Sequence, residues 1–156
     1  MKKHNRPSWD EYFITITKEV ATRSSCLRRK VGAVLVKNNR IISTGYNGSV
    51  RNTPHCENVG CLRNKLNVAP GTRHELCRGL HAEQNALLFA ANSGVTIEGS
   101  TVYCMNQPCI LCAKMLVQAG IKRVVYIEDY PDDFAKEIFK ESRVKLEKFQ
   151  KNSQKV

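Results

Sequence analysis

The sequence contains no long hydrophobic run and few aromatic residues. Its longest uninterrupted apolar stretch is 86–91, far short of the roughly 18 residues that a membrane-spanning helix needs. No apolar segment follows the basic residues at the start of the chain, so we expect no signal peptide and a cytoplasmic protein. Aromatic residues make up 7% of the chain, which leaves few platforms for stacking single-stranded bases. Internal repeats and low-complexity tracts are also missing, which argues against a repeat architecture.

The composition suits one globular domain, and basic residues are in excess. A chain of 156 residues with 42% hydrophobic residues can bury a single core. The formal net charge is +11, although the segment 81–135 holds six acidic and three basic side chains. The basic excess therefore lies outside that segment and favours an anionic partner, either a nucleotide or a nucleic-acid backbone. A solvated basic face that aids solubility explains the charge equally well.

Residue periodicity predicts strands that alternate with helices. Apolar residues recur at a helical spacing over 9–22, where Ser8 offers an N-cap and Glu11 stands three residues later. Two β-rich runs, 31–36 and 40–46, are joined by a short polar connection and predict an antiparallel hairpin. The later predicted elements are helices over 81–92, 109–118 and 131–140, and strands over 101–105, 123–127 and 144–149.

This order of elements predicts an α/β fold with a mixed five-stranded sheet. Strands that are joined through a helix by a right-handed crossover run parallel, whereas the first hairpin is antiparallel. Helices on both faces would cover the sheet and give three α/β/α layers. We expect a single domain over 8–149 and a flexible tail over 150–156.

Residues 47–80 interrupt the regular pattern. The segment is rich in Gly, Pro, Asn, Arg and Cys, has no sustained period, and is too long for an ordinary loop in a small domain. The chain has seven cysteines, an odd count that argues against a disulfide framework and favours metal binding or catalysis. We therefore interpret 47–80 as an inserted Cys- and His-containing loop that a metal could keep ordered.

Two short motifs, each at the start of a predicted helix, provide the ligands of a catalytic zinc. One is His81-Ala-Glu83, and the other is Pro-Cys109-Ile-Leu-Cys112. One imidazole and two thiolates fill three positions around zinc and leave the fourth for water. The positive ends of the two helices favour the thiolate form of the cysteines. Glu83 is free to handle protons beside the open position.

A closed structural zinc site is the alternative, and Cys104 is the only nearby residue that could be its fourth ligand. Such a site has no use for a carboxylate two residues from its histidine. On a predicted strand, Cys104 fits better as a small core residue. The pattern H-x-E followed by P-C-x-x-C is the signature of zinc-dependent nucleobase deaminases.

Four segments of the chain resemble one enzyme family: 25–36, 45–48 (Gly-Tyr-Asn-Gly), 81–86 (His-Ala-Glu-Gln-Asn-Ala) and 107–114. In these residues the chain resembles the deoxycytidylate (dCMP) deaminase family of the zinc-dependent cytidine deaminase superfamily, which includes the deaminase proteins of late competence operons. The similarity covers about residues 8–149 and is weakest over 51–80. It implies a cytidine deaminase-like fold.

The resemblance also implies an activity, the hydrolytic deamination of dCMP to dUMP and ammonia, which feeds thymidylate synthesis. Zinc held by His81, Cys109 and Cys112 would activate a water that attacks C4 of the cytosine ring. Glu83 would accept the proton of this water, pass it to N3 and then protonate the departing amine.

Substrate-binding residues follow from the same resemblance. Asn47 is a candidate for the sugar, Arg28 for the 5′-phosphate, and Ala82 for a further substrate contact. Tyr126 and Tyr130 are candidates to flank the phosphate. The alternatives are a turn residue for Asn47, a surface charge for Arg28, and ordinary half-buried aromatics for the two tyrosines.

Regulation and assembly are further implications of the resemblance. Members of the family often form hexamers that dCTP activates and dTTP inhibits, with Mg²⁺ accompanying the triphosphate. The candidate effector-binding residues in this chain are Gly45, Tyr46, Asn47 and Gly48. The expected partners are therefore dCMP, these effectors and further copies of the chain, with no membrane and no nucleic acid.

A second, closed zinc site is expected before the catalytic motif, as in some members of the family. The expected ligands are Cys26, Cys56, His74 and Cys77, with Cys61 or His55 as substitutes. Free thiols in a partly mobile loop are the alternative.

Two other functions compete with the deamination of a nucleotide. A deaminase that acts on a base in RNA or single-stranded DNA would use the basic charge to hold the backbone, but aromatic residues are few. A zinc-stabilised nucleic-acid-binding or competence-related module without activity would have no use for Glu83.

Overall fold

Helix α1 (Trp9–Ala21) begins at the capping box that the sequence predicts. The Ser8 hydroxyl accepts a hydrogen bond from the N–H of Glu11 at 3.2 Å, and the Glu11 carboxylate accepts one from the N–H of Ser8 at 2.8 Å. Since apolar residues recur along one side of the helix, Phe13 and Ile14 are buried against the sheet.

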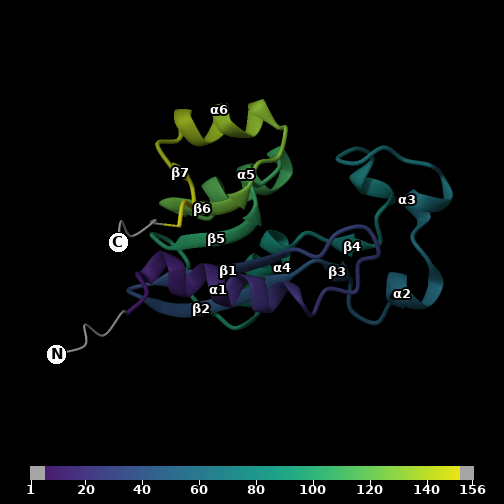
Figure 1. Cartoon of the computed structure of the whole chain (residues 1–156), viewed down its shortest axis with the longest axis horizontal. Coiled ribbons are helices and arrows are strands. Elements are labelled where there is room, and N and C mark those ends of the chain that lie inside the picture. The colour runs from purple at the N-terminus through teal and green to yellow at the C-terminus, as the bar shows by residue number, and fades with distance from the viewer. Residues whose placement is uncertain (1–5, 152–156) are drawn as a thin grey trace.

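The computed structural model describes residues 6–151, and a five-stranded mixed sheet forms its centre (Figure 1). The strands are β1 (Gly32–Lys37), β2 (Arg40–Tyr46), β5 (Thr101–Asn106), β6 (Arg123–Glu128) and β7 (Lys145–Lys148). They lie in the order β2-β1-β5-β6-β7, with β1 antiparallel to both of its neighbours and β5, β6 and β7 parallel. The predicted mixed sheet is confirmed, with strand bounds within one residue of those predicted.

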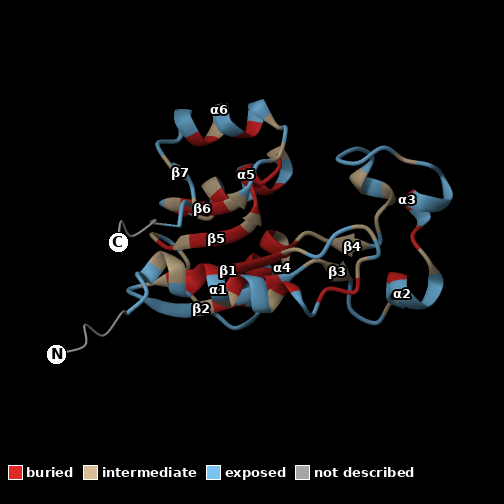
Figure 2. Cartoon of the chain, in the orientation of Figure 1, coloured by how far each residue is buried: buried red, intermediate tan, exposed pale blue. Residues whose placement is uncertain are grey.

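Helices cover both faces of this sheet, as expected for three α/β/α layers. α1 packs on one face, where Val34, Tyr103 and Val125 meet Phe13 and Ile14. The helices on the other face are α4 (Ala82–Asn92), α5 (Ile110–Gln118) and α6 (Asp133–Glu141). They bury the alternate residues of the same strands, so the central strands are buried on both sides (Figure 2).

The inserted segment 47–80 extends beyond one end of the sheet (Figure 1). Its short elements are β3 (Gly48–Ser49), α2 (Cys56–Val59), α3 (Leu62–Lys65), the single 3-10 turn η1 (His74–Leu76) and β4 (Gly79–Leu80). β3 and β4 pair antiparallel and close the segment at its base. The sequence pattern predicted none of these elements, because each is too short to show a period.

Helix α4 lies directly against β2, and Gly45 makes this approach possible. A methyl group at Gly45 would lie 2.3 Å from the carbonyl oxygen of Ala82 and 2.4 Å from the amide nitrogen of Ala86. Asn85 stabilises the contact between α4 and β2, because its Nδ2 donates a hydrogen bond to the carbonyl oxygen of Tyr46 at 2.8 Å. The first turn of α4 is thereby fixed at the end of the sheet from which the insertion leaves.

Two expectations from the sequence concern the C-terminal tail and membrane-spanning helices. Of the tail expected over 150–156, residues 152–156 lie outside the described residues. Within 6–151, no helix has both the length and the apolar composition that crossing a bilayer requires.

Candidate active site

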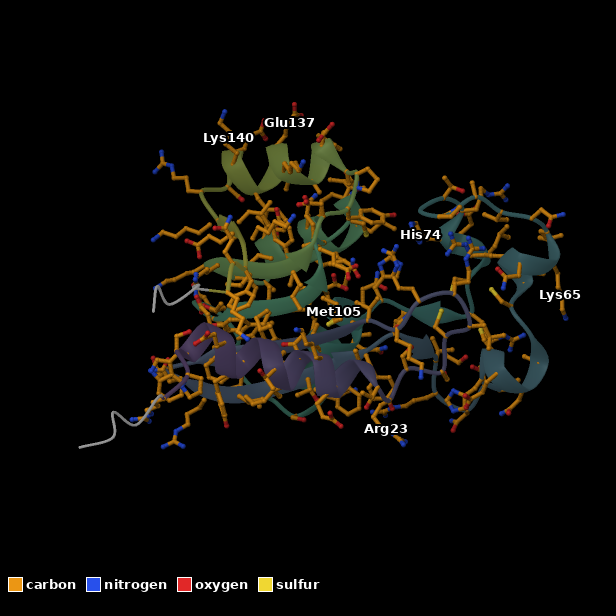
Figure 3. The ribbon with its side chains drawn as sticks, in the orientation of Figure 1. Arg23, Lys65, His74, Met105, Glu137 and Lys140 are labelled. Atoms are coloured by element: carbon orange, nitrogen blue, oxygen red, sulfur yellow. The ribbon has the colours of Figure 1, made fainter. Side chains whose placement is uncertain are left out.

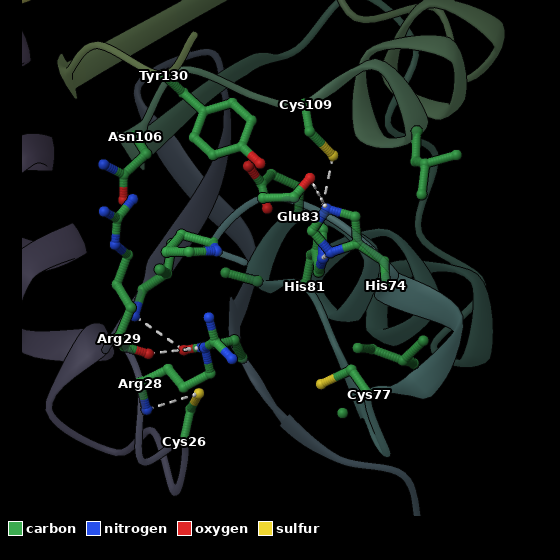
Figure 4. Close-up of a pocket in the computed structure, with 18 of the residues that line it drawn as sticks. Cys26, Arg28, Arg29, His74, Cys77, His81, Glu83, Asn106, Cys109 and Tyr130 are labelled. Atoms are coloured by element: carbon green, nitrogen blue, oxygen red, sulfur yellow. Dashed lines mark hydrogen bonds between the residues drawn. The ribbon is translucent and has the colours of Figure 1, made fainter. Parts of the chain in front are cut away.

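Helices α4 and α5 each begin with a candidate metal ligand. His81 is the N-cap residue of α4, Cys109 is the N-cap residue of α5, and Cys112 lies in the first turn of α5. Nδ1 of His81 lies 3.5 Å from Sγ of Cys109 (Figure 4) and 3.3 Å from Sγ of Cys112. The three ligand atoms lie within 4.8 Å of one another, and no other such group of ligand residues occurs within 6–151.

The two thiols of this group have pKa values shifted in opposite directions. A hydrogen bond from Cys112, supported by one with His81, lowers the pKa of Cys109 to about 4. The pKa of Cys112 is raised well above its ordinary value, because Cys112 gives that hydrogen bond and is buried. One thiolate, one thiol and one imidazole with its Nδ1 turned toward them suit Zn²⁺, and metal binding would release the remaining proton.

Glu83 lies beside the three ligand residues and is almost completely buried. It is 5% exposed, and its Oε2 lies 3.7 Å from Sγ of Cys112. Burial raises the pKa of the Glu83 carboxyl above its ordinary value. A raised pKa makes it easier for this carboxyl to take up a proton that it can later release, which suits a general acid and base.

Glu83 and His81 line a cavity of about 680 Å³, a size typical of small-molecule sites. Arg28, Arg29 and Arg63 line the same cavity, and none of them forms a salt bridge within the described residues. Glu83, Asp129 and Asp132 line the cavity as well, so the three arginines favour an anionic group where their own side chains lie rather than throughout the cavity.

Arg63 was not identified from the sequence. Its side chain is 8% exposed, and one Nη2 donates a hydrogen bond to the carbonyl oxygen of Thr72 at 2.6 Å. Its Nε is buried and has no hydrogen-bond partner. The residue lies in the insertion, which has no periodicity, so no local pattern distinguishes a buried arginine from a surface one.

Arg28 and Asn47 line the cavity, and both also make contacts that hold the surrounding loops together. Arg28 Nη2 donates a hydrogen bond to the carbonyl oxygen of Val68 in the insertion at 3.0 Å. Asn47 Oδ1 accepts hydrogen bonds from the Ser24 hydroxyl at 2.6 Å and the Val31 N–H at 2.8 Å. These bonds, with a further one from its Nδ2 to the backbone, leave Asn47 a single amide hydrogen for a ligand.

The other predicted substrate residues lie in different environments. Ala82 and Tyr130 line the cavity. The pKa of Tyr130 is raised by burial and by the nearby negative charge of Cys109. Tyr126 is placed differently from what the sequence predicts: its side chain packs in the core under α5 and α6, and it is not a cavity-lining residue. The alternation along β6 turns this side chain toward the helices, so Tyr126 is not brought to the site.

Four cysteines gather around the base of the insertion. Burial raises the pKa of Cys56, and the neighbouring thiols of Cys61, Cys77 and Cys26 add to this effect. All seven cysteines of the chain are free thiols, in agreement with the prediction against a disulfide framework.

His74 and His55, both considered for the second metal, are engaged elsewhere. The two ring nitrogens of His74 contact His81 and the carbonyl oxygen of Gly71. His55 Nδ1 lies 3.0 Å from the hydroxyl of Ser25. The second-site ligands expected from the sequence remain a prediction, since within 6–151 no three of their ligand atoms lie within 4.8 Å of one another.

Comparison with known proteins identifies the family. A family model described as the cytidine and deoxycytidylate deaminase zinc-binding region matches residues 7–128, which include both metal motifs. The chain belongs to this family. The deaminase family and the cytidine deaminase-like fold that the sequence predicts are thereby confirmed, and a zinc-binding region agrees with the His81, Cys109 and Cys112 group.

Several members of the deaminase family resemble the chain over most of its length. It is 44% identical to a deoxycytidylate deaminase of Schizosaccharomyces pombe over 82% of the chain, and 41% identical to ComE operon protein 2 of Bacillus subtilis over 91%. The matched segments make up 39% and 71% of these relatives, so the chain spans about two-fifths of the length of the yeast protein.

A solved structure of the family is similar to the chain over most of its length. The dCMP deaminase of cyanophage S-TIM5, crystallised with dCMP and dUMP, is 33% identical with a TM-score of 0.78. The alignment covers 94% of this chain and 100% of the cyanophage chain.

Proposed function

We propose that this protein deaminates dCMP hydrolytically to dUMP and ammonia. The observation that carries the proposal is the buried Glu83 beside His81, Cys109 and Cys112 in a cavity with three unpaired arginines. The deoxycytidylate deaminases among the relatives and the dCMP and dUMP in the cyanophage structure support this choice of substrate.

The chemistry requires a metal and one proton carrier. Zinc held by His81, Cys109 and Cys112 supplies a water that is acidic enough to lose its proton near neutral pH. Glu83 takes that proton and delivers it to N3 of cytosine as oxygen adds to C4. Glu83 would then take the remaining proton of the hydroxyl group at C4 and pass it to the amine, so that a C4 carbonyl forms as the C–N bond breaks and dUMP and ammonia result. The burial that raises the pKa of Glu83 suits both steps.

The 5′-phosphate is the part of the substrate that the arginines would bind. Arg28, Arg29 and Arg63 line the cavity without acidic partners, and a guanidinium can pair with two phosphate oxygens at once. We also assign the remaining amide hydrogen of Asn47 to the sugar, and Ala82 and Tyr130 to the walls around the substrate.

We infer that a second zinc orders the insertion. Cys26, Cys56, Cys61 and Cys77 are the residues assigned to it, because all four line the same cavity and the other three thiols raise the pKa of Cys56, although within 6–151 no three of their sulfur atoms lie within 4.8 Å of one another. Cys61 thus replaces His74 in the set expected from the sequence. Four thiolates make a closed site of the kind that stabilises structure.

Effector binding and assembly form the last part of the proposal. A segment that binds dCTP or dTTP together with Mg²⁺ must be accessible, and Tyr46 is 37% exposed at the end of the edge strand β2. Gly48 lines the cavity, whereas Gly45 packs closely against the backbone of α4. Exposed apolar residues on α4 and α5, Leu88, Phe89, Leu111 and Met115, support association into a homo-oligomer, with a hexamer as the proposed state.

Ammonia release from four substrates tests the proposed activity. Purified protein would be incubated with dCMP, dCTP, deoxycytidine or an RNA hairpin, each with and without dCTP or dTTP as effector. We expect turnover of dCMP, stimulated by dCTP and suppressed by dTTP. Reaction of the hairpin alone would contradict the proposal and favour a nucleic-acid deaminase.

A further inference from the structure

We propose that His74 is the positioning residue that fixes the ring of the metal ligand His81. Nδ1 of His74 lies 3.2 Å from Nε2 of His81, and the two rings meet edge to face with centroids 4.8 Å apart. Nε2 of His74 lies 3.1 Å from the carbonyl oxygen of Gly71. Figure 4 shows the two imidazoles side by side, next to Cys109 and Glu83.

With a metal in place of the proton on Nδ1 of His81, one arrangement of protons satisfies the contacts that run from Gly71 through His74 to His81. A carbonyl oxygen can only accept a hydrogen bond, so Nε2 of His74 carries the proton that binds Gly71. Nδ1 of a neutral His74 is then an acceptor, and Nε2 of His81 must donate to it. The lone pair of His81 is left on Nδ1, the atom that faces the sulfurs of Cys109 and Cys112.

The row therefore selects the tautomer of His81 that a metal requires. A histidine that binds a metal usually donates its other N–H to an acceptor, which holds the ring in place and makes the ligand nitrogen more basic. Within the described residues, the hydrogen bond to His74 is the only one recorded for Nε2 of His81. His74 acts on the metal through His81 and needs no contact with the substrate.

His74 lies in the inserted segment 47–80 and reaches His81 from there. Its 3-10 turn is closed by hydrogen bonds from the N–H of Leu76 to the carbonyl oxygen of Arg73 at 3.1 Å, and from the N–H of Cys77 to that of His74 at 2.9 Å. Figure 3 places His74 between the insertion and the body of the domain, whereas Lys65 of the same insertion points outward. The insertion therefore completes the surroundings of a ligand that belongs to the main fold.

Three substitutions at His74 test the role, which rests on the zinc site of the proposed function. In His74→Asn, the side-chain Oδ1 keeps an acceptor near the position of Nδ1. His74→Gln moves the amide outward, toward the position of Nε2, and His74→Leu removes both polar atoms. Glu75→Gln, in the same turn and with a side chain that is 63% exposed, is the matched control.

The readout is the affinity of the apo-protein for zinc, measured by competition with a chelator in the absence of substrate. Because the wild-type protein is expected to bind two zinc ions, the chelator competition should show two phases. The phase that Cys109→Ser lacks belongs to the site that contains His81. For that phase we expect affinity to fall about 10- to 100-fold in His74→Leu, to fall similarly in His74→Gln, and to stay within about threefold in His74→Asn and Glu75→Gln.

A second readout separates positioning from a general structural role. When the variants are loaded with Co²⁺, the visible absorption bands should shift in His74→Leu and remain in His74→Asn, and kcat should fall more than KM rises. Unchanged zinc affinity in His74→Leu would overturn the proposal, as would equal affinities for Asn and Gln. The Asn and Gln pair decides the matter even if His74→Leu does not fold. Because zinc binding needs no dCMP, failure of the proposed activity would show separately as a wild-type protein that binds zinc but does not release ammonia.

Discussion

At the scale of single residues, the chemistry of the site depends on how far each group is removed from water. Glu83 and Cys109 lie close together, yet the pKa of Glu83 is raised by burial while hydrogen bonds lower that of Cys109 to about 4. The carboxyl of Glu83 thus suits a proton carrier, and the thiolate of Cys109 suits a metal ligand. The two opposite pKa shifts arise from burial in the first turn of α4 and from hydrogen bonds at the start of α5.

Replacing Glu83 with Gln tests the proton-carrying role. The substitution keeps the size of the side chain and removes the group that can be protonated, so we expect kcat for dCMP to fall by about 10²- to 10⁴-fold. Zinc content, measured by metal analysis, should not change, because Glu83 is not one of the three ligands. Activity close to that of the wild type would refute the role assigned to Glu83.

The proposed number of metal ions depends on which cysteines are present. Wild-type protein should contain two zinc ions per chain. Cys109→Ser and Cys56→Ser should each retain one, and Cys56→Ser should make 47–80 more susceptible to proteolysis because the insertion would lose its metal. Cys104→Ala is the control, since Cys104 is fully buried on β5 and belongs to neither group. A single zinc in the wild type would exclude the second site.

At the scale of elements, the position of the site depends on how closely α4 approaches β2. His81 and Glu83 belong to the first turn of α4, and the sheet can hold that turn only where no side chain intervenes. Gly45 meets this condition, since a Cβ there would lie within 2.4 Å of two backbone atoms of the helix. The resemblance implied an effector role for Gly45, and the structure gives it a packing role.

Gly45→Ala should therefore destabilise the protein and disturb the site together. Since backbone atoms cannot rotate away, the helix must shift, and overpacking of this kind costs about 1–3 kcal/mol or more. Thermal unfolding would report the loss of stability, and the zinc content would report the displacement of His81. Gly48→Ala is the control for stability, because a methyl group there meets its nearest neighbour at an ordinary 3.5 Å. Equal melting temperatures for the two variants would contradict this explanation.

At the scale of the whole molecule, an ion pair joins the start of the chain to the far part of the sheet. The carboxylate of Asp10 in α1 accepts two hydrogen bonds of 2.8 Å from Arg123 in β6 and one of 2.7 Å from the hydroxyl of Tyr103 in β5. The hydrogen bonds with Arg123 lower the pKa of Asp10 below its ordinary value. The pair therefore links the helix on one face to two strands that are distant in sequence.

This ion pair predicts a dependence of stability on pH. A carboxyl whose pKa is lowered by folding stabilises the native state above its unfolded pKa, and this stabilisation is lost as the pH falls through the folded pKa. Asp10→Asn should unfold at a lower urea concentration than the wild type at pH 7, and the difference should shrink on acidification. Asp133→Asn, at an exposed carboxylate, should show little difference at any pH. A difference for Asp10→Asn that is the same at pH 7 and at pH 3 would contradict the prediction.

The sequence by itself determined the elements and the metal motifs, because both are local patterns. A capping box and a helical spacing of apolar residues suffice to define α1, and short β-rich runs bounded by polar or turn residues suffice for the strands of the sheet. The spacing within the two motifs sets His81 and Cys109 at the starts of successive helices, where the fold brings their ligand atoms together. Right-handed connections and one hairpin then leave little choice of topology.

Only the tertiary structure decided what the insertion contributes. His74 reaches His81, Arg63 is buried beside the cavity, and Asn47 is occupied by loop contacts, although no periodicity in their surroundings indicates it. Tyr126, in a correctly predicted strand, faces the core rather than the cavity. The physical reason is that contacts between distant segments depend on the path by which a loop closes and on what it packs against. Neither is encoded in the spacing of neighbouring residues.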